Sequence, residues 1–329
     1  MSVLVITKSD DHEGIGQVLD FLREDGMRVV RMDTDRFPLE TSLSMHYTKG
    51  GEKLVFQSEE GEFDLREVTS VWYRRLNAAG RLPADMERQL RAGAVHETRL
   101  TILGMVASLK AFHLDPFHHV RHAESKQLQL QLAKELGIDI PRTLITNDPA
   151  SARAFYDECR GEVVTKMMAS FAVYDAQNRE KVVFTTALKP EDMGEALLDL
   201  RFCPMTFQER VPKSVELRAT IVGNKVFTAA VDSQKSADTK VDWRRDGLGL
   251  IDSWVPYDLP KEVEERLLGL MAHFRLNYGA ADFVVTPDGR HVFLEVNPVG
   301  EFFWLDKFTG LPISRAIAGI LAGHGRRVF

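Results

Sequence analysis

The sequence predicts an α/β protein made of three consecutive parts, at residues 1–115, 116–203 and 204–329. Three observations predict it. A strand–helix–strand pattern opens the chain, helices and short strands alternate in the middle, and a strand-rich block with an acidic hairpin closes it. At 329 residues the chain is long enough for two domains or one elaborated domain. We expect an N-terminal α/β domain, a small central domain and a C-terminal α+β domain.

The first part is expected to be a parallel α/β unit. An apolar strand is followed by a helix with apolar residues at three- and four-residue spacing, and Gly26 ends that helix before the chain returns as a strand. This order is typical of a parallel sheet. The predicted elements are strands at Val3–Thr7, Met27–Met32 and Val71–Arg74, and helices over 11–25 and 83–110.

The middle part alternates helices with short strands. His113–His122 holds four histidines and Asp115, but their spacing fits no zinc signature, so we expect a polar loop. Two strands around 175–181 are expected to form a hairpin. The predicted helices are Glu124–Leu136, Pro149–Cys159 and Glu191–Leu200, and the predicted strands are Pro141–Thr146, Val163–Lys166, Phe171–Val173 and Val182–Thr186.

The final part is rich in strands. Its pattern predicts strands at Thr206–Val211, Leu217–Val222, Lys225–Val231, Ala281–Thr286 and His291–Asn297, with helices near 261–276 and 312–322. The aromatic run Phe302, Phe303 and Trp304 follows the last strand and is expected to pack in the interior, with lining of a substrate channel as the alternative.

Composition excludes several classes of protein. Hydrophobic residues make up 44% and charged residues 27%, an ordinary globular balance. The net charge of -6 disfavours nucleic-acid binding, which needs a basic surface. No apolar run is long enough to span a membrane, and the first residues do not resemble a signal peptide. Cys159 and Cys203 cannot build a disulfide framework, so we expect a cytoplasmic protein.

The most informative segment is the acidic hairpin at 280–298. Asp288-Gly289 predicts a two-residue turn, which places Asp282 opposite Glu295, with Asn297 on the same face. Like charges opposed across a sheet are destabilising, and a divalent cation between them removes that penalty. Oxygen ligands of this kind suit Mg²⁺; the alternative is a solvated acidic face. The residues expected on the core face are Phe283, Val285, Leu294 and Val296.

Several charged residues upstream of the hairpin suit a nucleotide. Lys126 lies in the first turn of a predicted helix, where the helix dipole favours anions, and Lys166 ends an apolar strand. Glu209 closes a strand whose backbone edge suits a purine. Glu216 suits ribose hydroxyls, and Arg218, on the same strand face, suits a phosphate or carboxylate. Each lysine taken alone is more typical of an ordinary surface position.

Taken together, these residues resemble the ATP-grasp superfamily in order and spacing, with Glu295 and Asn297 lying 13 and 15 residues after Asp282. The resemblance implies the ATP-grasp fold, with ATP bound between the central and C-terminal domains. The implied Mg²⁺ ligands are Asp282, Glu295 and Asn297, and the implied ATP contacts are Lys126, Lys166, Glu209, Arg210, Val211 and Glu216.

A narrower resemblance is to the microviridin-type, or graspetide, peptide-maturing ligases. Such enzymes phosphorylate an Asp or Glu side chain of a ribosomal precursor peptide. A Thr, Ser or Lys side chain then displaces phosphate and closes a macrocyclic ester or amide. The stretch after Lys166 departs from many ATP-grasp enzymes because it has no glycine-rich loop. The resemblance rests on VWYRR (71–75), the run 123–149, TKMMASF (165–171), FQERVPKSVELRATIVG (207–223), VDWRR (241–245) and FLEVNPVGEFFWL (293–305).

The graspetide resemblance implies further roles. Arg218, Lys166 and Arg244 are the implied catalytic residues. A precursor peptide with a leader and an acidic core is the implied partner, and a homodimer is the expected assembly. The leader would be held by a hairpin and a helix of the central domain. Arg179 is the candidate for contacting an acidic leader residue. The implied peptide-binding residues are Phe171, Val173, Tyr174, Arg179 and Val183, with Lys235–Arg245 as the next candidate.

Two other functions are also compatible with the sequence. One is an ATP-grasp carboxylate–amine ligase that acts on a free amino acid or a protein C-terminus. Against it, Ala280 stands where D-alanine-type ligases resemble one another in carrying arginine. The other is an ATP-binding module without activity, which the intact lysines and acidic trio disfavour.

Overall fold

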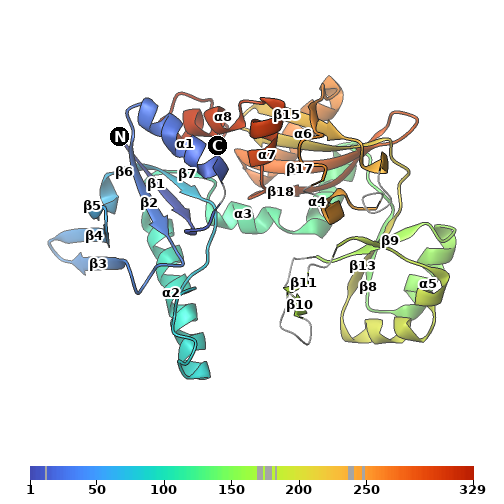
Figure 1. Ribbon diagram of the computed structural model, residues 1–329, viewed down its shortest axis with the longest axis horizontal. Helices are drawn as coiled ribbons and strands as arrows, with labels where there is room; N and C mark the ends of the chain where they lie inside the picture. Colours follow the sequence, from blue (N-terminus) through green and yellow to red (C-terminus); the bar gives the residue numbers. More distant parts are fainter. Residues whose placement is uncertain (12, 169–172, 175–179, 182–183, 236–240, 247–248) are drawn as a thin grey trace.

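The computed structural model describes all residues except 12, 169–172, 175–179, 182–183, 236–240 and 247–248. The N-terminal sheet and the C-terminal sheet lie side by side, and the central unit lies below the C-terminal sheet (Figure 1). Helix α3 runs beneath the boundary between the two large sheets. Among the described residues, no helix has both the length and the apolar character that a membrane span requires.

The N-terminal sheet has the strand order β2-β1-β6-β7, and all its pairs are parallel. Its side chains alternate between two cores, as the two-residue period of a strand requires. Val3 and Val5 pack against α1 and α8, whereas Leu4 and Ile6 pack toward α2. The predicted parallel unit is confirmed. Its elements are β1 (Ser2–Thr7), α1 (Glu13–Glu24), β2 (Arg28–Asp33), β6 (Val68–Tyr73), α2 (Arg88–Ser108) and β7 (Phe112–Leu114).

A second, antiparallel sheet inserted between β2 and β6 was not predicted from the sequence. It consists of β3 (Ser42–Thr48), β4 (Gly51–Ser58) and β5 (Gly61–Asp64), followed by a 3-10 turn at Leu65–Glu67. Leu54, Phe56 and Phe63 are buried in the same core as Leu4 and Ile6. The inserted sheet therefore covers one face of the parallel sheet.

The segment 113–122 was predicted to be a polar loop, and that prediction is wrong. Most of it forms helix α3 (Phe117–Ala123), which begins directly after Pro116. Val120 and Ala123 are buried against the core of the C-terminal part, so a narrow apolar face holds the helix in place. The histidines lie on the remaining faces of α3 and obscured this pattern.

The central unit contains a four-stranded sheet of order β12-β9-β13-β8. Thr186, predicted in a hairpin arm, instead pairs with Thr165 of β9, and the hairpin is β10 with β11. The predicted helix at 191–200 is two 3-10 segments, Pro190–Met193 and Glu195–Phe202, because Gly194 interrupts them with a ψ of -140°. The other elements are α4 (Lys126–Glu135), β8 (Thr143–Thr146), α5 (Pro149–Glu158), β9 (Val163–Lys166), β10 (Val173–Tyr174), β11 (Glu180–Lys181), β12 (Thr186–Ala187) and β13 (Met205–Glu209).

The C-terminal sheet has the order β16-β15-β14-β17-β18 and is antiparallel. On β14, Leu217, Ala219 and Ile221 pack under α6. The alternate residues Glu216 and Arg218 therefore lie on the opposite face. The elements are β14 (Val215–Val222), β15 (Lys225–Val231), β16 (Val255–Pro256), α6 (Lys261–Phe274), β17 (Tyr278–Val285), β18 (His291–Asn297), α7 (Phe303–Thr309) and α8 (Ile313–Ala322), with 3-10 turns at Ser233–Lys235 and Trp243–Asp246.

The acidic hairpin, formed by β17 and β18, departs from the predicted turn. Thr286 donates its N–H to Arg290 O at 2.9 Å, so the loop has three residues rather than two. Its third residue, Gly289, has a φ of +84°, which favours glycine. The longer loop shifts the pairing by one residue, and a bulge beyond Phe283 shifts it back.

Asp282 therefore pairs with Glu295, as predicted, although by a different route. The bulge turns Leu294 toward the cavity described below, so the expectation that Leu294 lies in the core is wrong. Phe293, which the predicted register placed on the opposite face, is fully buried in the core instead.

Polar contacts join the N-terminal and C-terminal parts. Asp115, which is 3% exposed, accepts hydrogen bonds from the backbone N–H groups of Asn277 and Tyr278 and from the Asn277 side chain, at 2.8 to 3.0 Å. The Asn277 amide oxygen in turn accepts the N–H of Val328. Elsewhere on the boundary, the Glu301 carboxylate accepts hydrogen bonds from the guanidinium groups of Arg74 and Arg75.

Asp115→Asn is expected to destabilise the protein. The substitution replaces an accepting oxygen with an NH₂ group that faces buried N–H donors, which costs about 2 kcal/mol. In a chain of this size that loss lowers the midpoint of thermal unfolding by roughly 5 °C. Differential scanning calorimetry of both proteins measures the shift, and an unchanged midpoint would show that this contact does not stabilise the boundary.

Candidate functional site

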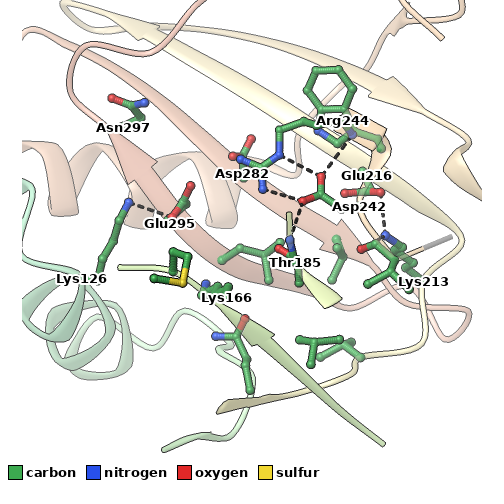
Figure 2. A pocket seen from close by; sticks show the side chains of 18 of the residues that line it. Lys126, Lys166, Thr185, Lys213, Glu216, Asp242, Arg244, Asp282, Glu295 and Asn297 are labelled. Carbon is green, nitrogen blue, oxygen red and sulfur yellow. Dashed lines mark hydrogen bonds and ion pairs between the residues drawn. The ribbon is translucent and has the colours of Figure 1, made fainter. Parts of the chain in front are cut away.

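A cavity of about 690 Å³ lies between the central sheet and the C-terminal sheet. Strands β9 and β13 supply one wall, and β14, β17 and β18 supply the other (Figure 2). Its described lining residues include Lys126, Lys166, Glu209, Arg210, Val211, Lys213, Glu216, Asp242, Arg244, Asp282, Glu295 and Asn297. Every residue that the sequence singled out for ATP or Mg²⁺ therefore reaches one cavity.

Two carboxylates stand side by side on the wall of this cavity. The pKa of Asp282 is raised to about 6, because burial, aided by the neighbouring charge of Glu295, outweighs the opposing charge of Arg218. Burial also disfavours the charged form of Glu295, but Lys126 and Lys166 outweigh it and bring the pKa of Glu295 to about 2. Asn297 lies beyond Glu295 on β18, and its Oδ1 accepts the N–H of Val299 at 3.0 Å.

Two lysines approach the carboxylates from the central unit. Lys126 is the first residue of α4, and its Nζ lies 2.7 Å from Oε2 of Glu295. Lys166 ends β9, and burial lowers the pKa of its ammonium group. Both lysines share the cavity with two carboxylates, so these opposite charges neutralise one another. Without the carboxylates, a negatively charged phosphate chain would be needed to balance the lysines.

The strand edge at Glu209 presents backbone rather than a free side chain. Arg142 Nε and Nη2 lie 3.0 and 3.2 Å from the two carboxylate oxygens of Glu209, and the Glu209 N–H donates to Arg142 O. This bidentate contact commits the carboxylate of Glu209 to Arg142. Arg210 and Val211 follow at the rim of the same cavity.

Glu216 is paired with Lys213, which was not identified from the sequence as a site residue. Lys213 Nζ lies 2.6 Å from Glu216 Oε1, and both side chains are about one-tenth exposed. Figure 2 shows this pair on the side of the cavity opposite to Lys126. Lys213 and Glu216 are close because the chain turns into β14 between them, and no pattern in the sequence marked that turn.

The two candidate catalytic arginines occupy different positions. Arg244 lines the cavity, and Asp242 accepts hydrogen bonds from its Nε and Nη2 at 2.8 and 2.7 Å. Arg218 lies deeper, outside the described lining, with its Nε 3.3 Å from Asp282 Oδ1 and its guanidinium over the Trp304 ring. Asp242, which also accepts the N–H of Thr185, was not singled out from the sequence.

The aromatic run after the hairpin packs in the interior, as expected. Phe302 and Trp304 are buried, and Trp304 contacts the rings of Trp243 and Trp254. Trp243 itself lines the cavity. The aromatic cluster therefore connects the cavity wall to the ring that supports Arg218.

The candidate peptide-binding residues are only partly described. Phe171, Arg179 and Val183 lie outside the described residues, as does part of the Lys235–Arg245 stretch. Val173 and Tyr174 form β10, where they pair with Lys181 and Glu180. Their role in peptide binding stays a prediction.

The carboxylate pair fits a hard divalent cation. Asp282 and Glu295 provide adjacent anionic oxygens, Asn297 provides an amide oxygen on the same strand, and the cavity beside them has room for phosphate oxygens. Among the described residues, no cluster of three His, Cys, Asp or Glu side chains forms a metal site built from the protein alone. Two carboxylates and an amide suit Mg²⁺ that is completed by phosphates and water.

Comparison with known proteins identifies the class. A family model described as the MvdD pre-ATP grasp domain matches residues 2–121. No curated protein matches the sequence. The fold and the cavity, with its lysines and acidic hairpin, are those of an ATP-grasp ligase.

Solved structures identify the family. The macrocyclase MdnC of Microcystis aeruginosa MRC, bound with its precursor peptide MdnA, is 46% identical over 98% of this chain and 100% of its own, with a TM-score of 0.90. A RiPP-associated ATP-grasp ligase of Chryseobacterium gregarium, in complex with ADP and a leader and core peptide, is 36% identical over 100% of this chain and 99% of its own, with a TM-score of 0.93.

A third structure agrees. The macrocyclase MdnB of Microcystis aeruginosa MRC is 36% identical over 97% of this chain and 98% of its own, with a TM-score of 0.82. The chain therefore belongs to the graspetide-type ATP-grasp ligases, the peptide-modifying enzymes that its sequence motifs resemble.

Proposed function

We propose that this enzyme uses ATP to activate Asp or Glu side-chain carboxylates of a ribosomal precursor peptide and closes macrocyclic esters or amides with Thr, Ser or Lys side chains. ADP and phosphate are the other products. The observation that carries the proposal is the convergence of Lys126, Lys166, Asp282 and Glu295 on one cavity. The similarity to MdnC, which is bound with a precursor peptide, supports a peptide as the substrate.

The nucleotide is assigned to the cavity between the two sheets. The backbone at Glu209, Arg210 and Val211 forms an edge for the purine, since the Glu209 side chain is held by Arg142. Glu216 is assigned to the ribose hydroxyls. Lys126 and Lys166 are assigned to the phosphates, which would replace Glu295 as the nearest anion to Lys126.

Magnesium is assigned to Asp282, Glu295 and Asn297. When bound there, it neutralises the charge of the phosphate oxygens during phosphoryl transfer. The ionised carboxylate of Glu295 and the amide oxygen of Asn297 are held on one strand, so their spacing is fixed before the cation arrives.

The reaction proceeds in two displacements. An oxygen of the peptide carboxylate attacks the γ-phosphorus of ATP, the bond to the β,γ-bridging oxygen breaks, and ADP leaves. The hydroxyl or amine of the second side chain then attacks the carbonyl carbon of the acyl phosphate, loses its proton, and phosphate leaves. Arg218 and Arg244 are assigned to the charge that develops on the acyl phosphate and on the departing phosphate.

Mass spectrometry tests the proposal directly. We would incubate the enzyme with ATP, Mg²⁺ and the precursor MdnA, because its partner MdnC is 46% identical to this chain. The expected result is the loss of one water mass per ring together with stoichiometric release of ADP. Release of ADP with free amino acids, and none with peptide, would instead favour a carboxylate–amine ligase.

Glu216→Gln is expected to weaken ATP binding more than turnover. The substitution removes the charge that accepts Lys213 and the proposed ribose contact, and such contacts act equally in the ground state and the transition state. We expect the KM for ATP to rise about tenfold while kcat changes less than about threefold. Steady-state kinetics with varied ATP measures both values, and a loss confined to kcat would remove Glu216 from the nucleotide site.

A further inference from the structure

Helix α2 carries a second hollow, outside the cavity. The second half of α2 is anchored in the core by Ile102, Met105 and Val106. In the first half, all of which the structure describes, Thr98 is the buried residue, and Figure 1 shows this half extending beyond the N-terminal sheet. A hollow of about 660 Å³ lies along it, between the helix and the segment that leads into it.

The lining of this hollow is basic with an apolar part. Of the described residues that line it, four are basic and none is acidic: Arg88, Arg91, His96 and Arg99 stand beside Ala84, Met86, Ala92 and Val95. Arg91 lies three residues after Arg88, and Arg99 lies eleven residues after it. The three arginines therefore share one face of the helix, with Val95 between them. The arrangement suits an extended, negatively charged chain, whose carboxylates pair with guanidinium groups while its carbon atoms contact the apolar residues.

Tyr73 lies between residues of the hollow and residues of the cavity. Tyr73, at the end of β6, stacks edge-on against Phe117 of α3, with ring centroids 5.4 Å apart. The charges of Arg99, Glu124 and Arg121 all reach the Tyr73 hydroxyl. Arg121 and Glu124 line the cavity, and Arg99 lines the hollow. Tyr73 therefore has charged neighbours from both sites.

We propose that this hollow, lined by Arg88, Arg91, His96 and Arg99, binds an acidic segment of the peptide substrate while another segment occupies the cavity. The inference rests on the proposed function and deepens it. A peptide that donates several Asp or Glu carboxylates still carries unreacted ones while the first is activated. Holding these on α2 keeps the peptide tethered between rounds and raises its effective concentration at the cavity.

The test measures binding of an acidic probe. A short synthetic peptide rich in Asp and Glu, with a neutral fluorophore, is titrated by anisotropy into the enzyme with saturating ADP. Its match replaces every Asp and Glu with Asn and Gln. The test variant is Arg91→Gln with Arg99→Gln, and the control is Arg23→Gln with Arg66→Gln, two exposed arginines on α1 and after β5.

We expect the double substitution on α2 to weaken binding of the acidic probe about three- to tenfold. The control should bind like the unchanged enzyme, and the amide probe should bind all proteins equally weakly. Added NaCl should reduce the affinity of the unchanged enzyme more than that of the α2 variant, because the variant has lost the charges that salt screens. Equal affinity of both variants for the acidic probe would overturn the proposal.

A second measurement separates this inference from the proposed function. The same proteins are incubated with MdnA and ATP, and products are resolved by mass. If MdnA is cyclised normally by the α2 variant and probe affinity is unchanged, the hollow is not a peptide site although the function stands. If the α2 variant changes only the sedimentation coefficient of the enzyme, α2 contacts a second copy of the chain, and the proposal is wrong. Weaker probe binding with accumulation of partly cyclised MdnA supports it.

Discussion

Glu295→Gln is expected to lower the rate of ADP release in the presence of peptide by about 100-fold or more. The substitution keeps the shape of the side chain but removes one of the two carboxylates assigned to Mg²⁺. A bound cation contributes several kcal/mol to the stabilisation of such a transition state. Glu295 is fully committed to the charged form, because Lys126 and Lys166 bring its pKa to about 2. A neutral amide cannot reproduce that charge.

Nucleotide binding provides a readout that separates this role from simple unfolding. In the absence of metal, Lys126 is paired with Glu295, so Glu295→Gln frees the lysine for a phosphate. ADP affinity measured by calorimetry in EDTA should therefore be retained or increased. Asp288→Asn, which neutralises an exposed carboxylate at the tip of the same hairpin, is the matched control and should behave like the unchanged enzyme. Normal turnover by Glu295→Gln would contradict the assignment of the hairpin to Mg²⁺.

The acidic hairpin shows how far sequence reasoning reaches. Its central pairing, Asp282 with Glu295, was predicted, yet two local features on which the prediction depended were wrong. The loop has three residues and the bulge adds one, and the two shifts cancel. Alternation within a strand is visible in the sequence, whereas a bulge depends on how the strand packs. Leu294 shows the consequence, since it lines the cavity instead of the core.

Other differences have similar physical causes. The inserted sheet β3–β5 was missed although Gly50-Gly51 and Gly61 mark its turns, because its apolar residues are sparse and only one face is covered. Helix α3 was missed because a two-residue apolar face is obscured by histidines. By contrast, β9, β15 and β18 agree with the predicted bounds residue for residue, since each is a short run of apolar or alternating residues between clear turn signals.

The site residues also fall into those that the sequence predicted and those that it did not. Residues that belong to a motif with fixed spacing were found, and those that act as partners were not. Arg142 holds Glu209 through a contact between distant segments, whereas Lys213 and Asp242 contact Glu216 and Arg244, which lie only three and two residues away along the chain. The first contact depends on tertiary packing and the other two on the conformation of short irregular segments, and spacing along the chain reveals neither. Their positions extend the site beyond the motif.

Arg218→Gln is expected to lower kcat by about 100-fold while the KM for ATP changes less than about threefold. Removing one group that stabilises charge developing in a transition state typically has an effect of this size. The side chain is already fixed for such a role, because its Nε lies 3.3 Å from Asp282 Oδ1 on one side and the Trp304 ring faces its guanidinium. A fixed cation requires little reorganisation when charge appears on the acyl phosphate.

The contact with Asp282 offers a second route by which Arg218 could act, and the two routes predict different kinetics. If Arg218 acts on the acyl phosphate, kcat falls at saturating Mg²⁺ and the Mg²⁺ concentration for half-maximal rate is unchanged. If it acts only by orienting Asp282, that Mg²⁺ concentration rises and saturation restores most of the rate. Arg142→Gln serves as the comparison, because its partner Glu209 lies at the proposed purine edge and its loss should raise the KM for ATP instead. An Arg218→Gln enzyme with unchanged kcat would remove the residue from the proposed machinery.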